Sequence, residues 1–181
     1  MNIKNDINKK EYNKVLLCAC KKYIKRHKNG ILVFNYNFND KEYIKGQFYK
    51  TDNFEPYCFC QLSIYEKKSV IIDKYEITKT DYFLVGGFDP SKFKGIIKLY
   101  KLIYNNENDN IEIKYIEDPI FEGINEIRGP ISCIIQSKQN GNILITSWDG
   151  NIYSFTVPNK EYISFLEKDE DKNFIFSNFI N

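Results

Sequence analysis

The residues of this chain that could bind a metal are two Cys-x-Cys pairs, Cys18 with Cys20 and Cys58 with Cys60. Alternate residues of a β-strand point to the same face, so each pair could offer two thiolates to one Zn²⁺ ion. Zinc sites, however, typically leave about two to four residues between the cysteines. Both pairs also lie in apolar runs, where a cysteine commonly acts as a small buried hydrophobe. We therefore favour core positions over a zinc site or redox chemistry, and the sequence predicts no cofactor.

Residues that could catalyse a reaction or bind a phosphate stand alone in this sequence. His27, the single histidine, lies in the basic stretch 21–28 (KKYIKRHK) without a Ser or Cys in a nucleophile motif beside it. The Gly86-Gly87 pair lacks the Gly-Lys-Ser/Thr continuation and the helix of a phosphate-binding loop. The acidic run 167–171 (EKDED) is typical of a solvated tail. No catalytic pattern results, and the sequence predicts that the chain is not an enzyme.

Charge, hydropathy and cysteine count exclude several classes of protein. Lys and Arg (26) nearly balance Asp and Glu (24), giving a net charge of +2, whereas nucleic-acid binding usually shows a basic excess or patch. No apolar run approaches the ~18 residues of a membrane span, and the first ten residues are polar, unlike a secretory signal. An odd number of cysteines, five, argues against a disulfide framework. We expect a cytoplasmic protein that binds neither nucleic acid nor membranes.

The elements that must position these residues are short β-strands. Runs of branched and aromatic residues are separated by turn signals, among them Asn-Gly at 29–30 and 140–141 and Asp-Gly at 149–150. Such pairs between apolar runs strongly favour hairpins, because both residues tolerate positive φ. No long segment has helical periodicity, so we expect an all-β fold. The predicted strands are residues 15–20, 31–38, 57–64, 82–88, 96–103, 111–117, 131–137, 143–148 and 151–157.

One layout recurs three times along the chain: an apolar strand, small residues, a turn ending in glycine, and a second apolar strand ending in an aromatic residue. The copies are residues 15–34, 83–100 and 143–155. In the last two copies the aromatic residue lies five positions after the glycine, as Gly95 to Tyr100 and Gly150 to Phe155. In the first copy it comes one residue earlier. Such internal repetition is the sequence signature of repeat architectures.

Further strands complete these repeats. Pro-led apolar strands containing Cys and Gln, residues 56–63 and 130–137, precede two of the copies. A third kind of segment follows two copies, as residues 41–44 and 111–116. Each full repeat is thus predicted to contain four short strands.

Four-strand units with this hairpin resemble WD40 repeats, the blades of a β-propeller. In that family a small residue and the turn aspartate belong to a hydrogen-bonded set that steadies each blade, and a terminal Trp fills the gap between blades. The structural positions that the resemblance implies are Ser147, Asp149, Gly150 and Phe155 in the last repeat and Gly87, Asp89, Gly95 and Tyr100 in the middle repeat. The chain departs from the family in lacking its Gly-His dipeptide and in spacing its copies more widely than the usual repeat of about 40–45 residues.

The resemblance implies four-stranded antiparallel blades of a WD40-like β-propeller over residues 15–158, between a polar N-terminal segment (1–14) and a charged and apolar C-terminal tail (159–181). About three blades cannot close a ring, since propellers typically have about 4–8. Either the chain belongs to a longer propeller or its open edges are completed by another chain, including by self-association. The implied function is a non-catalytic scaffold for protein–protein interaction. The alternative is the propeller portion of a larger, enzyme-associated protein.

Overall fold

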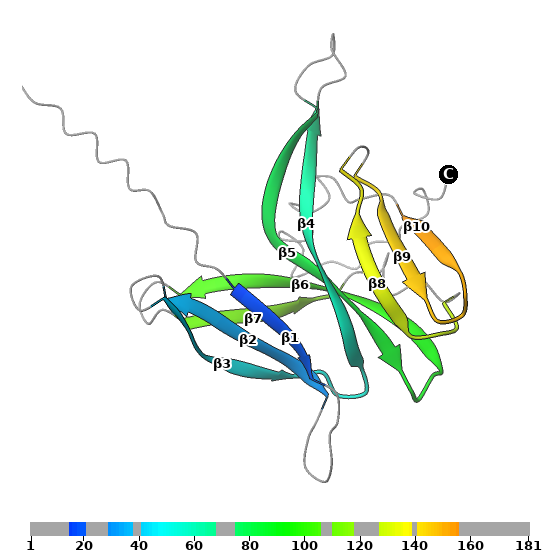
Figure 1. The fold of residues 1–181 in the computed structure, drawn as a ribbon, viewed down its shortest axis with the longest axis horizontal. Coiled ribbons are helices and arrows are strands. Elements are labelled where there is room, and N and C mark those ends of the chain that lie inside the picture. Colours follow the sequence, from blue (N-terminus) through cyan, green and yellow to red (C-terminus); the bar gives the residue numbers. More distant parts are fainter. Residues whose placement is uncertain are drawn as a thin grey trace, which may run out of the picture.

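The computed structural model describes residues 15–20, 29–37, 41–67, 75–105, 110–117, 127–138 and 141–155 (Figure 1). The two terminal segments and the basic stretch with His27 lie outside the described residues. Every regular element within the described ranges is a β-strand, which confirms the predicted all-β class. The same ranges contain no helix with the length and hydropathy of a membrane span.

Ten described strands follow one another along the chain. They are β1 (Val15–Cys20), β2 (Gly30–Asn37), β3 (Glu42–Lys50), β4 (Glu55–Lys67), β5 (Tyr75–Asp89), β6 (Lys94–Asn105), β7 (Asn110–Ile116), β8 (Ile131–Gln136), β9 (Ile143–Ser147) and β10 (Ile152–Phe155). Nine of them overlap a predicted strand. For β3 the sequence indicated only residues 41–44, because its apolar residues come in adjacent pairs, Tyr43-Ile44 and Phe48-Tyr49, and do not alternate. β4 and β5 run several residues past their predicted ends as one long hairpin, since ladder hydrogen bonds do not require apolar side chains.

The strands form three antiparallel sheets in chain order, β1-β2-β3, β4-β5-β6-β7 and β8-β9-β10. These groups coincide with the three repeats of the sequence. The middle sheet has the four strands expected of a repeat, whereas the first and last have three within the described residues. No sheet closes on itself, and the arrangement is compatible with propeller-like blades.

The middle sheet is covered on both faces. The side chains of β5 point alternately to the two neighbouring sheets. Tyr82 and Leu84 point toward the third sheet, and Phe83 and Val85 point toward the first. A strand covered on both faces reads as a continuous apolar run, as in the YFLV segment of β5. One cluster of buried residues joins the middle and third sheets, and a second joins the middle and first sheets. β4 lies between its neighbours β1 and β8 (Figure 1), so the three sheets meet along their first strands.

The two outer sheets each keep one face free of any described element. On the first sheet Leu16 and Phe48 are exposed, by 41% and 48%. On the third sheet Ile135 and Ile152 are exposed, by 53% and 74%. The stack of three sheets therefore ends in exposed apolar side chains on each side.

Candidate protein-interaction surface

Two hairpin turns of equivalent sequence stand at one end of the middle and third sheets. Each begins with an aromatic-Asp pair, Phe88-Asp89 at the end of β5 and Trp148-Asp149 after β9. In the first turn, Oδ1 of Asp89 accepts hydrogen bonds from the backbone N–H and hydroxyl of Ser91 at 2.9 and 2.6 Å and from Lys92 N at 3.3 Å. This buried carboxylate closes the turn by bonding groups that the backbone leaves unpaired.

The second turn is held by a larger set of hydrogen bonds. Oδ1 of Asp149 accepts from Asn151 N at 3.0 Å. Oδ2 of the same side chain accepts from the Tyr153 hydroxyl at 2.7 Å and from Arg128 N at 3.1 Å. The last bond ties the turn to the segment that precedes β8. Gly150 completes the turn with a φ of 87°, a conformation that other residues rarely adopt.

Ser147 joins this set from the end of β9. Its buried hydroxyl donates to the Gly129 carbonyl at 3.0 Å and accepts from Asp149 N at 3.3 Å. Ser147 and Asp149, which the WD40 resemblance placed in a hydrogen-bonded set, are thus directly bonded to each other. The middle repeat differs because Gly87 stands where Ser147 does and has no side chain to donate.

The hydrogen bonds also set the charge of the two turns. Burial opposes ionisation of Asp89, but the bonds from Ser91 and Lys92 outweigh it and lower the pKa of this carboxyl group. Desolvation likewise opposes ionisation of Asp149, and the bonds from Tyr153, Asn151 and Arg128 lower its pKa. Both carboxylates are therefore ionised, and engaged within their turns, at neutral pH.

Two glycines of the middle repeat lie where a side chain has no room. A Cβ atom at Gly87 would lie 2.0 Å from the Glu55 carbonyl oxygen of the neighbouring strand. A Cβ atom at Gly95 would lie 2.5 Å from the Gly129 carbonyl oxygen. Gly95 N also donates to the Ile127 carbonyl at 2.9 Å, so this close approach joins β6 to the segment before β8. Gly87 thus allows β5 to approach β4 closely, and Gly95 allows the middle sheet to meet the segment before β8.

The two aromatic residues that end the repeats differ in burial. Tyr100 is 7% exposed, lies in the cluster between the first and middle sheets, and stacks on Phe83 with ring centroids 5.6 Å apart. Burial raises the pKa of Tyr100 to about 12, so its hydroxyl stays protonated. Phe155 is half-buried and packs against the cluster between the middle and third sheets.

The most exposed aromatic side chains of the described residues lie on the two turns. Trp148 is 71% exposed and Phe93 is 76% exposed. Trp148 lies beside Tyr57 of β4, with ring centroids 6.1 Å apart, and Phe93 meets Phe88 edge to face at 5.7 Å. These four residues, Tyr57, Phe88, Phe93 and Trp148, are called the aromatic surface below.

The aromatic surface was not predicted from the sequence. The available signal was the aromatic residue directly before each turn aspartate, Phe88 and Trp148, whereas nothing in the sequence marked Phe93. Glu55 of β4 pairs with Phe88, and Tyr57 follows two residues later, so β4 connects the two halves of this surface.

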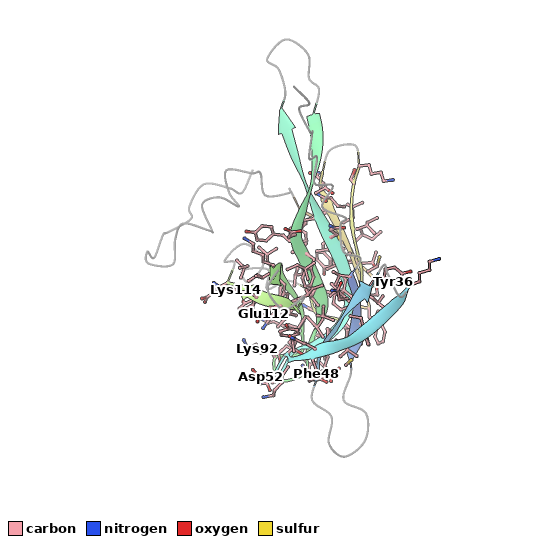
Figure 2. All side chains as sticks on the ribbon, turned by 90° about the vertical axis from the view of Figure 1, so that its left-hand side faces the viewer. Tyr36, Phe48, Asp52, Lys92, Glu112 and Lys114 are labelled. Carbon is pink, nitrogen blue, oxygen red and sulfur yellow. The ribbon has the colours of Figure 1, made fainter. Side chains whose placement is uncertain are left out.

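A cleft of about 660 Å³ adjoins the aromatic surface on the side of the first sheet. It lies between the segment 49–54, which leads from β3 to β4, and the strands β6 and β7 of the middle sheet. Lysines and aromatic residues dominate its lining, which also includes Asp52 and the buried Asp89. Figure 2 shows Asp52 and Lys92, from opposite walls, at the same end of the sheets.

The second Cys-x-Cys pair lies in the core, as its apolar surroundings predicted, whereas Cys18 and Cys20 belong to neither buried cluster. Cys60 belongs to the buried cluster between the middle and third sheets, and Cys58 packs against it. Cys18 and Cys20 are partly buried in the first sheet. Among the described residues, no three His, Cys, Asp or Glu side chains are grouped as metal ligands would be. Burial, together with the neighbouring Cys133 and Cys60, raises the pKa of Cys58 to about 11, which disfavours the thiolate that zinc requires.

We expect the thiols to differ sharply in reactivity. Alkylation requires the thiolate, and a pKa of about 11 leaves Cys58 with roughly 100-fold less thiolate at neutral pH than an ordinary thiol near pKa 9. Iodoacetamide should therefore modify the exposed Cys133 first and Cys58 and Cys60 last, as measured by mass spectrometry of the peptides. Raising the pH should accelerate the reaction of Cys58, and denaturant should abolish the difference in reactivity between the thiols.

The zinc content of the purified chain tests the core interpretation separately. One equivalent of bound zinc, lost when Cys18 and Cys60 are both changed to Ser, would contradict that interpretation.

Comparisons of the chain with protein-family models, with curated proteins and with solved structures found no match. What the chain does must therefore be inferred from its own residues.

Proposed function

We propose that this chain is a non-catalytic scaffold that binds a partner protein, built from three WD40-like blades of an incomplete β-propeller. The three consecutive antiparallel sheets, stacked face to face with their first strands together, support the blade assignment. Two further observations support it: Ser147 and Asp149 are hydrogen-bonded to each other, and Tyr100 is buried between two sheets. Both resemble interactions of blade-stabilising residues in that family.

The aromatic surface is the observation that carries the proposed function. A large aromatic side chain exposed by more than two-thirds loses favourable burial unless something covers it. Trp148 and Phe93 are held on turns fixed by Asp149 and Asp89, so a partner would immobilise little additional chain on binding. Tryptophan and tyrosine also dominate the binding energy of protein interfaces. Rigid, exposed aromatic residues on adjacent turns therefore suit recognition of another protein.

The same surface would serve the alternative, in which the blades belong to a larger, enzyme-associated protein. In that case the partner of the aromatic surface is another domain of the same polypeptide. Both versions assign binding, and no chemical step, to the residues of this chain.

We expect photo-crosslinking to locate the partner at the aromatic surface. A photoreactive phenylalanine analogue at position 93 should crosslink to a protein in a lysate of the source cells. The same analogue at Lys114, an exposed position on β7, is the matched control and should give no such product. Trp148→Ala should suppress the crosslink from position 93 and weaken the affinity for the crosslinked protein at least about tenfold, as for a central interface residue.

The control variant for affinity is Ile103→Ala, which removes an exposed apolar side chain from the middle sheet away from the turns. Equal crosslinking from positions 93 and 114, or equal loss of affinity in the Trp148 and Ile103 variants, would mean that the aromatic surface is not the binding site.

A further inference from the structure

We propose that the cleft beside the aromatic surface binds an acidic segment of the partner protein, one in which carboxylates flank an apolar or aromatic side chain. This inference rests on the proposed function and names the chemistry of the partner. The cleft is walled by the 49–54 segment on one side and by β6 and β7 on the other, and it opens beside the turn that carries Phe93.

The charges lining the cleft are unequal. Four lysines, at positions 50, 92, 94 and 98, face two carboxylates, Asp52 and Asp89. Asp52 is ion-paired with Lys50. The Asp89 carboxylate already accepts three hydrogen bonds within its own turn. Both carboxylates of the cleft thus already interact with groups of this chain. The lining keeps a net positive charge that a negatively charged group would neutralise.

Lys98 is the residue best placed to receive that group. Its ammonium group lies 5.4 Å from the centre of the Phe54 ring and 4.9 Å from the centre of the Tyr115 ring. These two cation–π contacts hold a half-buried lysine in a fixed position without neutralising its charge. No carboxylate of the described residues forms an ion pair with Lys98. A ligand carboxylate would find an ammonium group that is already oriented and partly desolvated. Charge-assisted hydrogen bonds are strong in such an environment.

Tyr100 supplies a second polar group to the same cleft. Residues 98 and 100 share one face of β6, and Tyr100 also contacts Tyr115. The Tyr100 side chain is 7% exposed, yet its hydroxyl takes part in no hydrogen bond among the described residues. Because burial keeps this hydroxyl protonated, it can donate to an anionic ligand. A donor that has no partner among the described residues and lies in the lining of the cleft is available to a ligand.

The wall opposite Lys98 is rigid. The Thr51 hydroxyl donates to the Phe54 carbonyl at 2.6 Å, and Phe54 N donates to the Thr51 carbonyl at 2.8 Å. Thr51 N in turn donates to the Asn29 carbonyl at 2.9 Å, which ties the segment to the first sheet. The Tyr49 hydroxyl donates to the Ile111 carbonyl at 3.0 Å and joins β3 to β7. The cleft is therefore formed before any ligand binds.

A protein segment fits this cleft better than a nucleic acid. Nucleic-acid sites extend a basic surface along many phosphates, whereas the chain has a net charge of +2 and two carboxylates in the lining of the cleft. The positive charge is concentrated around Lys98 and bounded by aromatic rings. One or two carboxylates with a neighbouring apolar side chain match that arrangement.

The test measures binding of labelled synthetic peptides to the full chain by fluorescence anisotropy. The probe is a repeating Glu-Tyr peptide, and the matched neutral probe is the corresponding Gln-Tyr peptide. We expect the acidic probe to bind and the neutral probe to bind at least about tenfold more weakly, with an affinity that falls as salt is added.

Lys98→Met keeps the aliphatic stem and removes the charge, and should weaken binding of the acidic probe about tenfold. The matched control is Lys101→Met. Lys101 lies on the same strand and its ammonium group also sits over an aromatic ring, 5.3 Å from the centre of Tyr82, but it does not line the cleft. This variant should change the affinity less than about twofold. Unchanged melting temperatures in both variants verify that the comparison concerns folded protein.

Three results would overturn the inference: equal binding of the two probes, equal effects of the Lys98 and Lys101 variants, or tighter binding of an oligouridine RNA than of the acidic peptide. These failures are separate from failure of the proposed function. Crosslinking from position 93 that depends on Trp148 would still support a protein partner even if the cleft did not bind acidic segments.

Discussion

Phe83→Ala is expected to lower the free energy of unfolding by about 3–5 kcal/mol, as measured by denaturant unfolding. Phe83 is 2% exposed and lies in the cluster between the first and middle sheets. Its ring stacks on Tyr100 at 5.6 Å and meets Phe59 at 6.4 Å. Truncation would remove both contacts and leave a cavity where two sheets pack, and neither sheet can collapse into it without losing its register.

Phe93→Ala is the matched control, because it changes the same residue type at a position that is 76% exposed. We expect it to alter stability by less than about 0.5 kcal/mol. The pair also separates stability from binding, since Phe93 belongs to the aromatic surface. A small effect of Phe83→Ala would mean that the first sheet does not pack on the middle sheet.

The isolated chain is expected to self-associate, with the outer face of the first sheet of one copy packed on the outer face of the third sheet of another. Both faces carry exposed apolar side chains, Phe48 and Ile135 among them, and are covered by no described element. Soluble monomers seldom expose apolar patches larger than a few hundred Å². The new contact would repeat the way in which the middle sheet already packs against its two neighbours. Sedimentation velocity over a range of protein concentrations measures it.

A charge on either face should break this association. Because the contact joins two different faces, Phe48→Glu and Ile135→Glu should each shift the chain toward the monomer. Ile103→Glu, at an exposed position of the middle sheet, is the control and should leave association unchanged. A wild-type chain that sediments as a monomer at every concentration would refute the expectation. An effect of Phe48→Glu alone would point instead to a contact between two first sheets.

Local sequence signals determined the strands and their grouping. The Asn140-Gly141 and Asp149-Gly150 turns between apolar runs specify the β8–β9 and β9–β10 hairpins, because the positive φ at Gly141 and Gly150 is a local property of the chain. Consecutive hairpins then pair in chain order, so the three repeats became three sheets. The apolar setting of Cys58 and Cys60 likewise predicted their burial, since alternation along β4 places both on the same face.

Features that depend on contacts between sheets could not be predicted in the same way. β3 was only partly predicted because its apolar residues do not alternate, and its Gly46 is required where a Cβ atom would lie 1.5 Å from the Val33 carbonyl oxygen beside an irregular register. The long extension of the β4–β5 hairpin was also missed, because its sequence lacks a continuous apolar run.

The cleft and the aromatic surface also depend on contacts between segments far apart in the sequence. The alternation of Ile96, Lys98 and Tyr100 along β6 marks Lys98 as a charge on an otherwise inward face, but not as one placed between the rings of Phe54 and Tyr115. Phe54 comes from the segment between β3 and β4, and Tyr115 comes from the neighbouring strand β7, so only tertiary packing brings the three together. Trp148 is comparable: its exposure agrees with the turn position after β9, but its place beside Tyr57 of β4 depends on how the third sheet packs on the middle sheet. Local turn chemistry and alternation are encoded within a few residues, whereas the cleft and the aromatic surface arise where distant segments meet.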